Sequence, residues 1–325
     1  MPLLQVNDLK LEFGDPPNAV RALDGVSLSV DSGETLGLVG ESGSGKSVTA
    51  LSIARLLPGP ARYVGGEILL DGHDVLCMSP AELPQIRGAV VNYVFQEPGA
   101  SLNPVFRIGH QIKEALKLHR PEAATDAEVI SLLQRVGIPA PECRIRSYPH
   151  EMSGGMQQRV MIAMALAARP KLLIADEPTT ALDVTIQAQV IELLRSIKEQ
   201  FNMAIMLITH NLGIVGDLAD RLAVMYAGQI VETGPARDVL QDPMHPYTKA
   251  LIESVPALGS DSDRLHAIPG VVPKLSALPS GCRFHPRCPI AQPQCSSTPV
   301  PLSQTDPGRQ VRCPYAKGLP VAKAP

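Results

Sequence analysis

The stretch GESGSGKS, residues 40–47, has the residue types and spacing of a phosphate-binding loop. Its glycines let successive backbone N–H groups turn inward around phosphate oxygens. Lys46 can bring a positive charge to the outer phosphates of a nucleotide, and the Ser47 hydroxyl can coordinate Mg²⁺. The residues predicted to contact a nucleoside triphosphate here are Gly40, Glu41, Ser42, Gly43, Ser44, Gly45, Lys46, Ser47 and Val48.

A second stretch, LLIADE at 172–177, places two carboxylates at the end of an apolar segment. Such a segment predicts a buried strand, and ligands of α/β proteins bind beyond the carboxyl ends of their strands. We expect Asp176 to hold Mg²⁺, through water. We expect Glu177 to orient or deprotonate the water that attacks the terminal phosphate.

Strands and helices must position these motifs, and the hydrophobic periodicity of the sequence predicts both. A strand at 35–40 precedes the phosphate loop and a helix follows Lys46. The pattern further predicts strands at 26–30, 65–72, 171–177 and 203–210, a hairpin at 221–234, and helices at 108–119, 125–136, 154–168, 184–200 and 246–254. The alternation predicts an α/β fold.

Composition narrows the class of protein. The chain has 325 residues, a net charge of −3, no Trp and 3% aromatic residues, which argues against nucleic-acid binding through stacked bases. The N-terminus lacks the pattern of a signal peptide. The longest apolar runs, such as 160–168, are too short to cross a membrane. We therefore expect a protein of the cytosol.

The stretch MSGGMQQR, residues 152–159, resembles the signature motif of ABC-transporter ATPase subunits. Ser153 is a good N-cap, and Gly154 and Gly155 leave the N–H groups of a helix start open to an anion. Met156 replaces the usual Gln of that motif. The resemblance implies that these residues cap the ATP held by a second subunit.

Four further residues match landmarks of the same family. Gln96, in VFQEP, resembles the residue that senses Mg²⁺ and the attacking water. Asp183, in TTALD, resembles the loop that crosses the dimer. His210, in LITHN, resembles the switch histidine that contacts the γ-phosphate. Phe13 lies where the family places an aromatic ring against adenine, and it is equally suited to a core.

The resemblance covers about residues 3–255 and implies a fold. That fold is an ABC-type nucleotide-binding domain of the P-loop NTPases, with a RecA-like core, an antiparallel β subdomain and an α-helical subdomain at about 97–168. It implies two domains, an ATPase domain at 1–255 and a small cysteine-containing extension at 256–325. It also implies that two ATP molecules join two such domains head to tail and that hydrolysis releases them.

Several longer stretches resemble one branch, the dipeptide, oligopeptide and nickel importers. The branch implies a heterodimer with a second, related ATPase, two integral-membrane permeases that contact 97–112, an external peptide-binding protein acting indirectly, and a place on the cytoplasmic face of the membrane. The stretches are VGESGSGKS, FQEPGASLNPVFRIGHQI, DEPTTALDVTIQAQ and HPYTKALIESVP.

The extension holds a cysteine set with spacings unlike those of common zinc sites. Four thiolates are the usual ligands of a [4Fe–4S] cluster, and zinc is the alternative. The resemblance implies the [4Fe–4S] cluster and implies that His285 is not one of its ligands. Two other cysteines, Cys77 and Cys143, are expected to be buried and inert. The expected cluster ligands are Cys282, Cys288, Cys295 and Cys313.

The resemblance implies the ATP-hydrolysing subunit of a membrane ABC importer for dipeptides or oligopeptides, and three alternatives remain. The first is a nickel or other small-solute importer of the same branch, although the nickel branch usually lacks such an extension. The second is a soluble ABC ATPase in nucleic-acid repair or translation. The third is a scaffold ATPase for iron–sulfur assembly, suggested by the cysteines.

Overall fold

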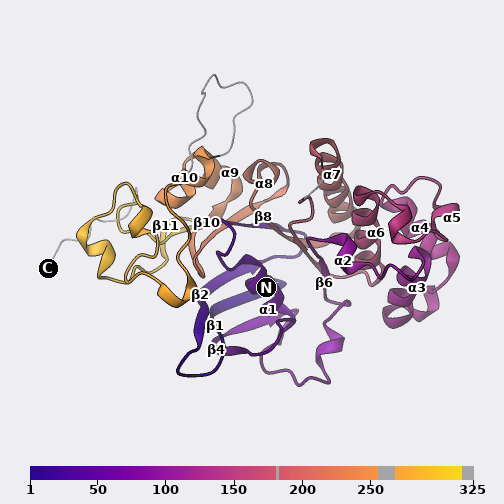
Figure 1. Cartoon of the computed structure of the whole chain (residues 1–325), viewed down its shortest axis with the longest axis horizontal. Coiled ribbons are helices and arrows are strands. Elements are labelled where there is room, and N and C mark those ends of the chain that lie inside the picture. The colour runs from indigo at the N-terminus through magenta and orange to yellow at the C-terminus, as the bar shows by residue number, and fades with distance from the viewer. Residues whose placement is uncertain (181–182, 255–267, 317–325) are drawn as a thin grey trace. The chain divides into compact units, whose positions relative to one another are not determined.

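A computed structural model of the chain describes residues 1–180, 183–254 and 268–316 (Figure 1). These residues form two compact units. The helical unit comprises Cys77–Leu207 with two short segments, Met1–Leu3 and Asp31–Gly33. The phosphate-loop unit comprises Leu4–Val30, Glu34–Leu76 and the described residues from Ile208 onward.

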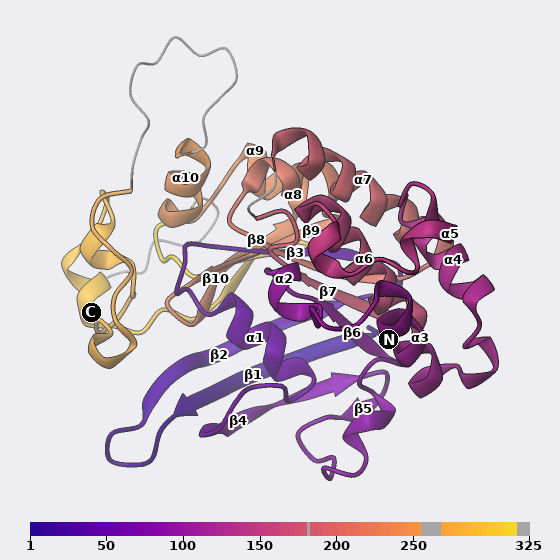
Figure 2. The same cartoon turned by 45° about the vertical axis from the view of Figure 1, so that its right-hand side comes forward.

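The first sheet of the phosphate-loop unit is antiparallel, in the order β2-β1-β4-β5. Both views show β1, β2 and β4 side by side (Figures 1 and 2). β1 was not predicted because its pairing register shifts between Val6 and Leu9, around Asp8 in the left-handed region, which breaks the alternation of a regular strand. The bounds are β1 Leu4–Phe13, β2 Val20–Val30, β4 Ala61–Leu70 and β5 His73–Asp74.

The second sheet of this unit has the order β11-β12-β10-β9-β3. β3 and β9 are parallel, and every residue of β3 is buried, as expected of a strand covered on both faces. The bounds are β3 Thr35–Val39, β9 Arg221–Tyr226, β10 Gln229–Pro235, β11 Ser303–Asp306 and β12 Arg309–Val311, with helices α1 Lys46–Ile53, α8 Leu212–Leu218, α9 Ala236–Gln241 and α10 Pro246–Glu253.

The helical unit places parallel strands beside a group of helices. β6 pairs with β7 in parallel, and α3 and α4 both contact α6. The bounds are β6 Val91–Val94, β7 Leu172–Asp176, β8 Ala204–Thr209, α2 Pro98–Ser101, α3 Ile108–His119, α4 Asp126–Arg135, α5 Pro141–Arg144, α6 Gly154–Ala167 and α7 Val184–Phe201. Most predicted helices and strands are therefore confirmed to within a few residues.

The described residues of the extension belong to the phosphate-loop unit and pack against its core. Phe284, 1% exposed, joins a core cluster with Val39, Tyr226 and Tyr247. Strands β11 and β12 extend the second sheet, and neither was predicted because their sequences, SQTD and RQV, are short and mostly polar. The predicted boundary at 255/256 falls outside the described residues.

Short 3₁₀ turns complete the described elements, at Leu83–Gln85, Pro121–Ala123, Pro149–Glu151, Leu275–Ala277, His285–Arg287 and Pro293–Ser296. Within the part of the chain that the structure describes, no helix combines the length and apolar character needed to span a membrane.

Candidate nucleotide site and the surfaces around it

The phosphate loop follows β3 and leads into α1. Gly40 and Gly45 both have positive φ angles, 156° and 108°. A Cβ at Gly40 would overlap the Met225 carbonyl oxygen, so only glycine fits there. Ser44, 1% exposed, has a hydroxyl oxygen without a hydrogen-bond partner among the described residues. A glycine-shaped loop with a buried polar atom of this kind suits a phosphate ligand.

The lysine of the loop is held in place by carbonyl groups of the loop itself. Lys46 Nζ donates hydrogen bonds to the carbonyls of Gly40, at 2.8 Å, and Glu41, at 2.9 Å. Gly228 N–H donates to the Ser44 carbonyl at 2.7 Å, which ties the loop to the turn after β9. Ser47 is exposed at the first turn of α1. Lysine, hydroxyl and backbone N–H groups therefore gather at one helix start, as phosphate and Mg²⁺ require.

The acidic residues lie at the end of β7 in the helical unit. Asp176 is half-buried, and Glu177 has a left-handed φ of 48°, which is uncommon outside glycine. Gln96 Nε2 and Thr180 Oγ1 both donate to Glu177 Oε2, at 3.0 and 2.8 Å. The structure thus brings two predicted site residues, Gln96 and Glu177, into direct contact.

The signature stretch begins α6, as predicted. Ser153 is its N-cap, and its side chain accepts a hydrogen bond from Met156 N–H. A Cβ on Gly155 would lie 2.8 Å from Ile186 Cγ2, so glycine allows close packing of α6 against α7. Asp183 caps α7 by accepting from Ile186 N–H at 2.9 Å. Ser153, Gly154 and Asp183 are all exposed.

The remaining predicted residues belong to the phosphate-loop unit. Phe13 ends β1 and is half-buried. His210 follows β8 and is exposed. The adenine contact of Phe13 and the γ-phosphate contact of His210 stay predictions.

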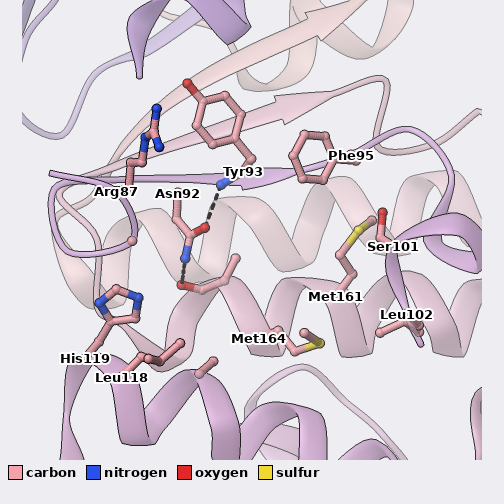
Figure 3. Close-up of a pocket in the computed structure, with 13 residues that line it drawn as sticks. Arg87, Asn92, Tyr93, Phe95, Ser101, Leu102, Leu118, His119, Met161 and Met164 are labelled. Atoms are coloured by element: carbon pink, nitrogen blue, oxygen red, sulfur yellow. Dashed lines mark hydrogen bonds between the residues drawn. The ribbon is translucent and has the colours of Figure 1, made fainter. Parts of the chain in front are cut away.

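An apolar groove of about 330 Å³ lies on the helical unit (Figure 3). Asn92 bridges its floor, with its side chain accepting from Tyr93 N–H and donating to the Ala165 carbonyl. The predicted permease-contact range 97–112 supplies only Ser101 and Leu102. Sequence reasoning missed the other side chains because they come from three separate segments. They include Tyr93, Phe95, Leu118, His119, Met161 and Met164.

Most of that range is nevertheless exposed. The sequence of this range predicts that Pro98, Asn103, Pro104 and Phe106 are exposed. Phe106 is 44% accessible, Asn103 and Pro104 are exposed, and the neighbouring Val105 is 70% accessible. Pro98, at the start of α2, is half-buried, so the prediction is wrong for this residue. Exposed apolar side chains beside a groove are typical of a protein-binding surface.

The four extension cysteines line one cavity of about 20 Å³ in the phosphate-loop unit, together with His245. The Cys282 N–H donates to the Cys295 carbonyl at 2.8 Å, which joins the two segments. Burial raises the pKa of Cys282 and Cys288, raises that of Cys313 to about 11, and lowers the pKa of His245 to about 3. Among the described residues, no three or more His, Cys, Asp or Glu side chains are grouped so that they could hold a metal ion.

Cys77 and Cys143 are both exposed, so the expectation that they are buried is wrong. Neither lies in a regular strand or on the inner face of a long helix. Cys77 follows β5 and Cys143 lies in the four-residue α5. The residue type alone therefore does not predict whether an isolated cysteine lies in the core or at the surface.

A contact that sequence reasoning missed lies at the loop residue Glu41. Its carboxylate pairs with Arg287 of the extension, at 2.8 and 2.9 Å. Burial alone would lower the pKa of Arg287, but its hydrogen bonds to Glu41 and Tyr226 outweigh that effect and raise it. The sequence did offer a signal: a carboxylate inside a phosphate loop calls for a cation, and the extension is rich in arginine.

Comparison with protein families gives two matches. Residues 23–180 match the ABC transporter family, and residues 231–295 match the C-terminal region of oligopeptide/dipeptide transporters. Among solved structures, the chain resembles an ATP-binding cassette dimer in a post-hydrolysis state bound to ADP and phosphate, with a TM-score of 0.63 and 25% identity over 72% of this chain and 99% of that one. A Clostridium perfringens protein that is part of an ABC transporter complex gives a TM-score of 0.65 and 27% identity over 74% and 91% of the two chains.

Curated relatives match almost from end to end. The dipeptide transport ATP-binding protein DppD of Escherichia coli is 49% identical over 97% of both chains. The oligopeptide transport ATP-binding protein OppD of Salmonella typhimurium is 48% identical over 96% of this chain and 93% of its own. A putative peptide import ATP-binding protein of Brucella melitensis is 50% identical over 96% and 95%. The chain therefore belongs to the ABC transporter family, in the branch of the peptide-import ATP-binding proteins.

Proposed function

We propose that this chain is the ATP-hydrolysing subunit of an ABC importer for dipeptides or oligopeptides. The observation that carries the proposal is the near full-length similarity to dipeptide and oligopeptide transport ATP-binding proteins, together with the phosphate loop. The names of these relatives favour peptides over nickel, nucleic-acid repair or iron–sulfur assembly. The chain thus converts ATP and water into ADP and phosphate to drive import.

The phosphate loop binds the nucleotide. On ATP binding, Lys46 exchanges its two carbonyl partners for phosphate oxygens, and the N–H groups of the loop surround the β-phosphate. Ser47, Asp176 and Gln96 would hold Mg²⁺, which neutralises charge on the phosphates. The donor set of a hydroxyl, a carboxylate and an amide oxygen suits this hard cation. Phe13 contacts the adenine.

Glu177 acts as the general base for water attack. Gln96 and Thr180 both donate to its Oε2 atom, which fixes the plane of the carboxylate. His210 contacts the γ-phosphate, as the family resemblance implies. This arrangement orients water and accepts its proton.

Two chains complete each other's site. Ser153, Gly154 and Gly155 lie at an exposed helix start and cap the ATP that a second subunit holds. Asp183 accepts a hydrogen bond from Ile186, and the Ile186 side chain lies next to Gly155 of the signature. The second subunit is a related but different ATPase, so the working unit is a heterodimer. ATP binding closes the dimer and hydrolysis reopens it.

The groove on the helical unit receives a cytoplasmic helix of a permease. Its apolar lining and the exposed Val105 and Phe106 suit an amphipathic helix. Two integral-membrane permeases dock in this way, one on each ATPase, and an external peptide-binding protein delivers the peptide to them. The chain is accordingly a peripheral protein on the cytoplasmic face of the membrane.

The extension cysteines hold a [4Fe–4S] cluster, with a zinc ion as the alternative. The support is chemical: four thiols line one cavity, and thiolates are the ligands that such clusters use. In the structure these thiols are not grouped as a site for a single metal ion. When bound, a cluster would cross-link Cys282, Cys288, Cys295 and Cys313. Anaerobic purification with iron, sulfide and zinc analysis, repeated on Cys282→Ser, tests this point.

The transport function is tested by reconstituting the chain with its permeases, its partner ATPase and the binding protein in vesicles. Dipeptides and oligopeptides are added singly, and nickel is the control cargo. We expect peptide to stimulate phosphate release and Glu177→Gln to abolish it. Stimulation by nickel alone would overturn the peptide assignment, and stimulation of the chain by nucleic acid without permeases would overturn transport altogether.

A further inference from the structure

One ion pair joins the extension to the phosphate loop. Arg287 lies in the 3₁₀ turn His285–Arg287, and Glu41 is the second residue of the loop. Arg287 Nη1 donates to Glu41 Oε2 at 2.8 Å, and Nη2 donates to Oε1 at 2.9 Å. The Arg287 side chain is 5% exposed and the Glu41 side chain 28%. This bidentate geometry is the strong and directional form of an ion pair.

The guanidinium is fixed from its other sides as well. Its Nε donates to the Pro269 carbonyl at 2.7 Å. It also lies over the rings of Tyr226 and Phe284, at 5.8 and 5.9 Å from their centroids. These contacts with the extension and the core fix the guanidinium in a single position, from which it pairs with Glu41.

The backbone of Glu41 is anchored too. Its N–H donates to the Tyr247 hydroxyl at 2.8 Å, and Tyr247 on α10 is fully buried. Side chain and main chain of this loop residue are therefore both set by residues far along the sequence. The entry to the phosphate loop is positioned from the C-terminal part of the chain.

Charge gives this contact a role in binding. Glu41 carries a negative charge inside a loop that receives an anion, and in a partly buried setting such repulsion is only weakly screened. Arg287 cancels that charge. We propose that Arg287 is a positioning residue of the nucleotide site, which neutralises and orients Glu41 so that the extension takes part in ATP binding by its own chain.

The pair also lies beside the cysteine cavity. The His285 N–H donates to the Cys282 carbonyl at 3.0 Å, and the Cys288 N–H donates to the His285 carbonyl at 3.3 Å. Arg287 therefore lies in a turn that is flanked by Cys282 and Cys288.

The inference rests on the proposed function, since it assumes that the loop binds ATP. The test is a titration of the full chain with a fluorescent ATP analogue and Mg²⁺, at low and at high salt. The variants are Arg287→Gln, Arg287→Lys, Glu41→Gln and the double variant. Arg283→Gln is the matched control, because Arg283 also ties the extension to the rest of the unit, by a 2.5 Å ion pair with Asp24 and a hydrogen bond to the Ala227 carbonyl, without touching Glu41.

We expect Arg287→Gln to weaken ATP binding about tenfold at low salt and less at high salt. The double variant regains most of the lost affinity because the repelling charge is gone. Arg287→Lys keeps charge but not the bidentate geometry, so it falls between wild type and Arg287→Gln. Arg283→Gln is expected to bind ATP nearly as tightly as wild type, because its ion-pair partner Asp24 lies outside the phosphate loop.

Failure of the inference and failure of the proposed function are distinguishable. If the wild-type chain does not bind ATP, the proposed function fails. If it does, and Arg287→Gln binds ATP as tightly as Arg283→Gln, the inference is wrong. Weak binding by Arg287→Gln that Glu41→Gln does not restore also overturns it, because the loss would then come from a loosened extension. Limited proteolysis of each variant shows whether the extension stays docked.

Discussion

The ion pair between Arg309 and Glu232 makes a sharp prediction about stability. Glu232 lies in β10 and is fully buried, and Arg309 of β12 donates to its Oε1 atom at 2.9 Å. The carboxylate also accepts from the N–H groups of Met244 and His245, both at 2.9 Å. Arg309→Gln would leave a buried carboxylate with two backbone donors and no cation.

The magnitude follows from this geometry. Removing one partner of a buried ion pair costs roughly 3–5 kcal/mol. The two N–H donors that remain compensate part of the charge, so we expect the low end, about 3 kcal/mol. Arg309 also donates to the Asp242 carbonyl, and that bond is lost as well. A typical unfolding free energy is roughly 5–15 kcal/mol, so the loss is a large fraction of it.

The assay is urea denaturation of the full chain, with hydrogen exchange of the β10 amides to report on this unit alone. Lys249→Ala is the control, because its ion pair with Glu253 is long, 3.9 Å, and both side chains are more than half exposed. We expect that control to cost less than about 0.5 kcal/mol. Glu232→Gln added to Arg309→Gln is expected to restore part of the stability.

Two results would refute the reasoning. One is a loss for Arg309→Gln no larger than that of the Lys249 control. The other is a double variant as unstable as the single one, because the cost would then not come from the unpaired charge.

The remaining predictions concern the site and the thiols. Lys46→Ala removes the cation of the phosphate loop and is expected to lower ATP affinity at least about a hundredfold, measured by nucleotide titration with circular dichroism as the folding check; wild-type affinity would contradict it. Glu177→Gln keeps ATP binding but is expected to cut phosphate release by roughly a hundredfold or more and to trap a closed dimer, visible by size-exclusion chromatography; turnover at the normal rate would reject Glu177 as the base. In the metal-free chain, iodoacetamide at pH 7.5 is expected to label the exposed Cys77 and Cys143 before Cys282, Cys288 and Cys313, since burial raises the pKa of these three and so lowers their thiolate fraction. Mass spectrometry follows the order in which the thiols are labelled. Raising the pH should narrow the difference in labelling rate between the exposed and the extension thiols. Equal labelling rates would contradict the burial of the extension thiols.

Much of the fold was predictable because local signals agreed with tertiary structure. The strand at 172–176 is a continuous apolar run, and the helix from 154 begins at a serine N-cap with glycines behind it. Such elements need no partner to be recognised. The predicted helix at 108–119 coincides with α3, since its apolar residues recur with helical spacing.

The misses have a common physical origin, because they depend on distant residues. β12 is a strand because it pairs with β10 and β11, and its three residues carry no strand signal of their own. The groove side chains come from separate segments, and Arg287 meets Glu41 across 246 positions of sequence. Motif spacing predicts which residues can do chemistry, whereas contacts of this kind need the folded chain.

The pairing of β12 with β10 has a consequence for any attempt to dissect this protein. β10 is buried along most of its length, and Arg312 N–H donates to the Val231 carbonyl at 2.8 Å beside the two strand pairs. A chain cut before the extension would present that buried strand as an open edge, which invites pairing with other chains. The short polar strand β11 now stands outermost among the described strands of this sheet. The extension thus covers a strand edge that would otherwise promote aggregation. A truncation made to test the role of the extension in transport would therefore be confounded by aggregation of the shortened chain.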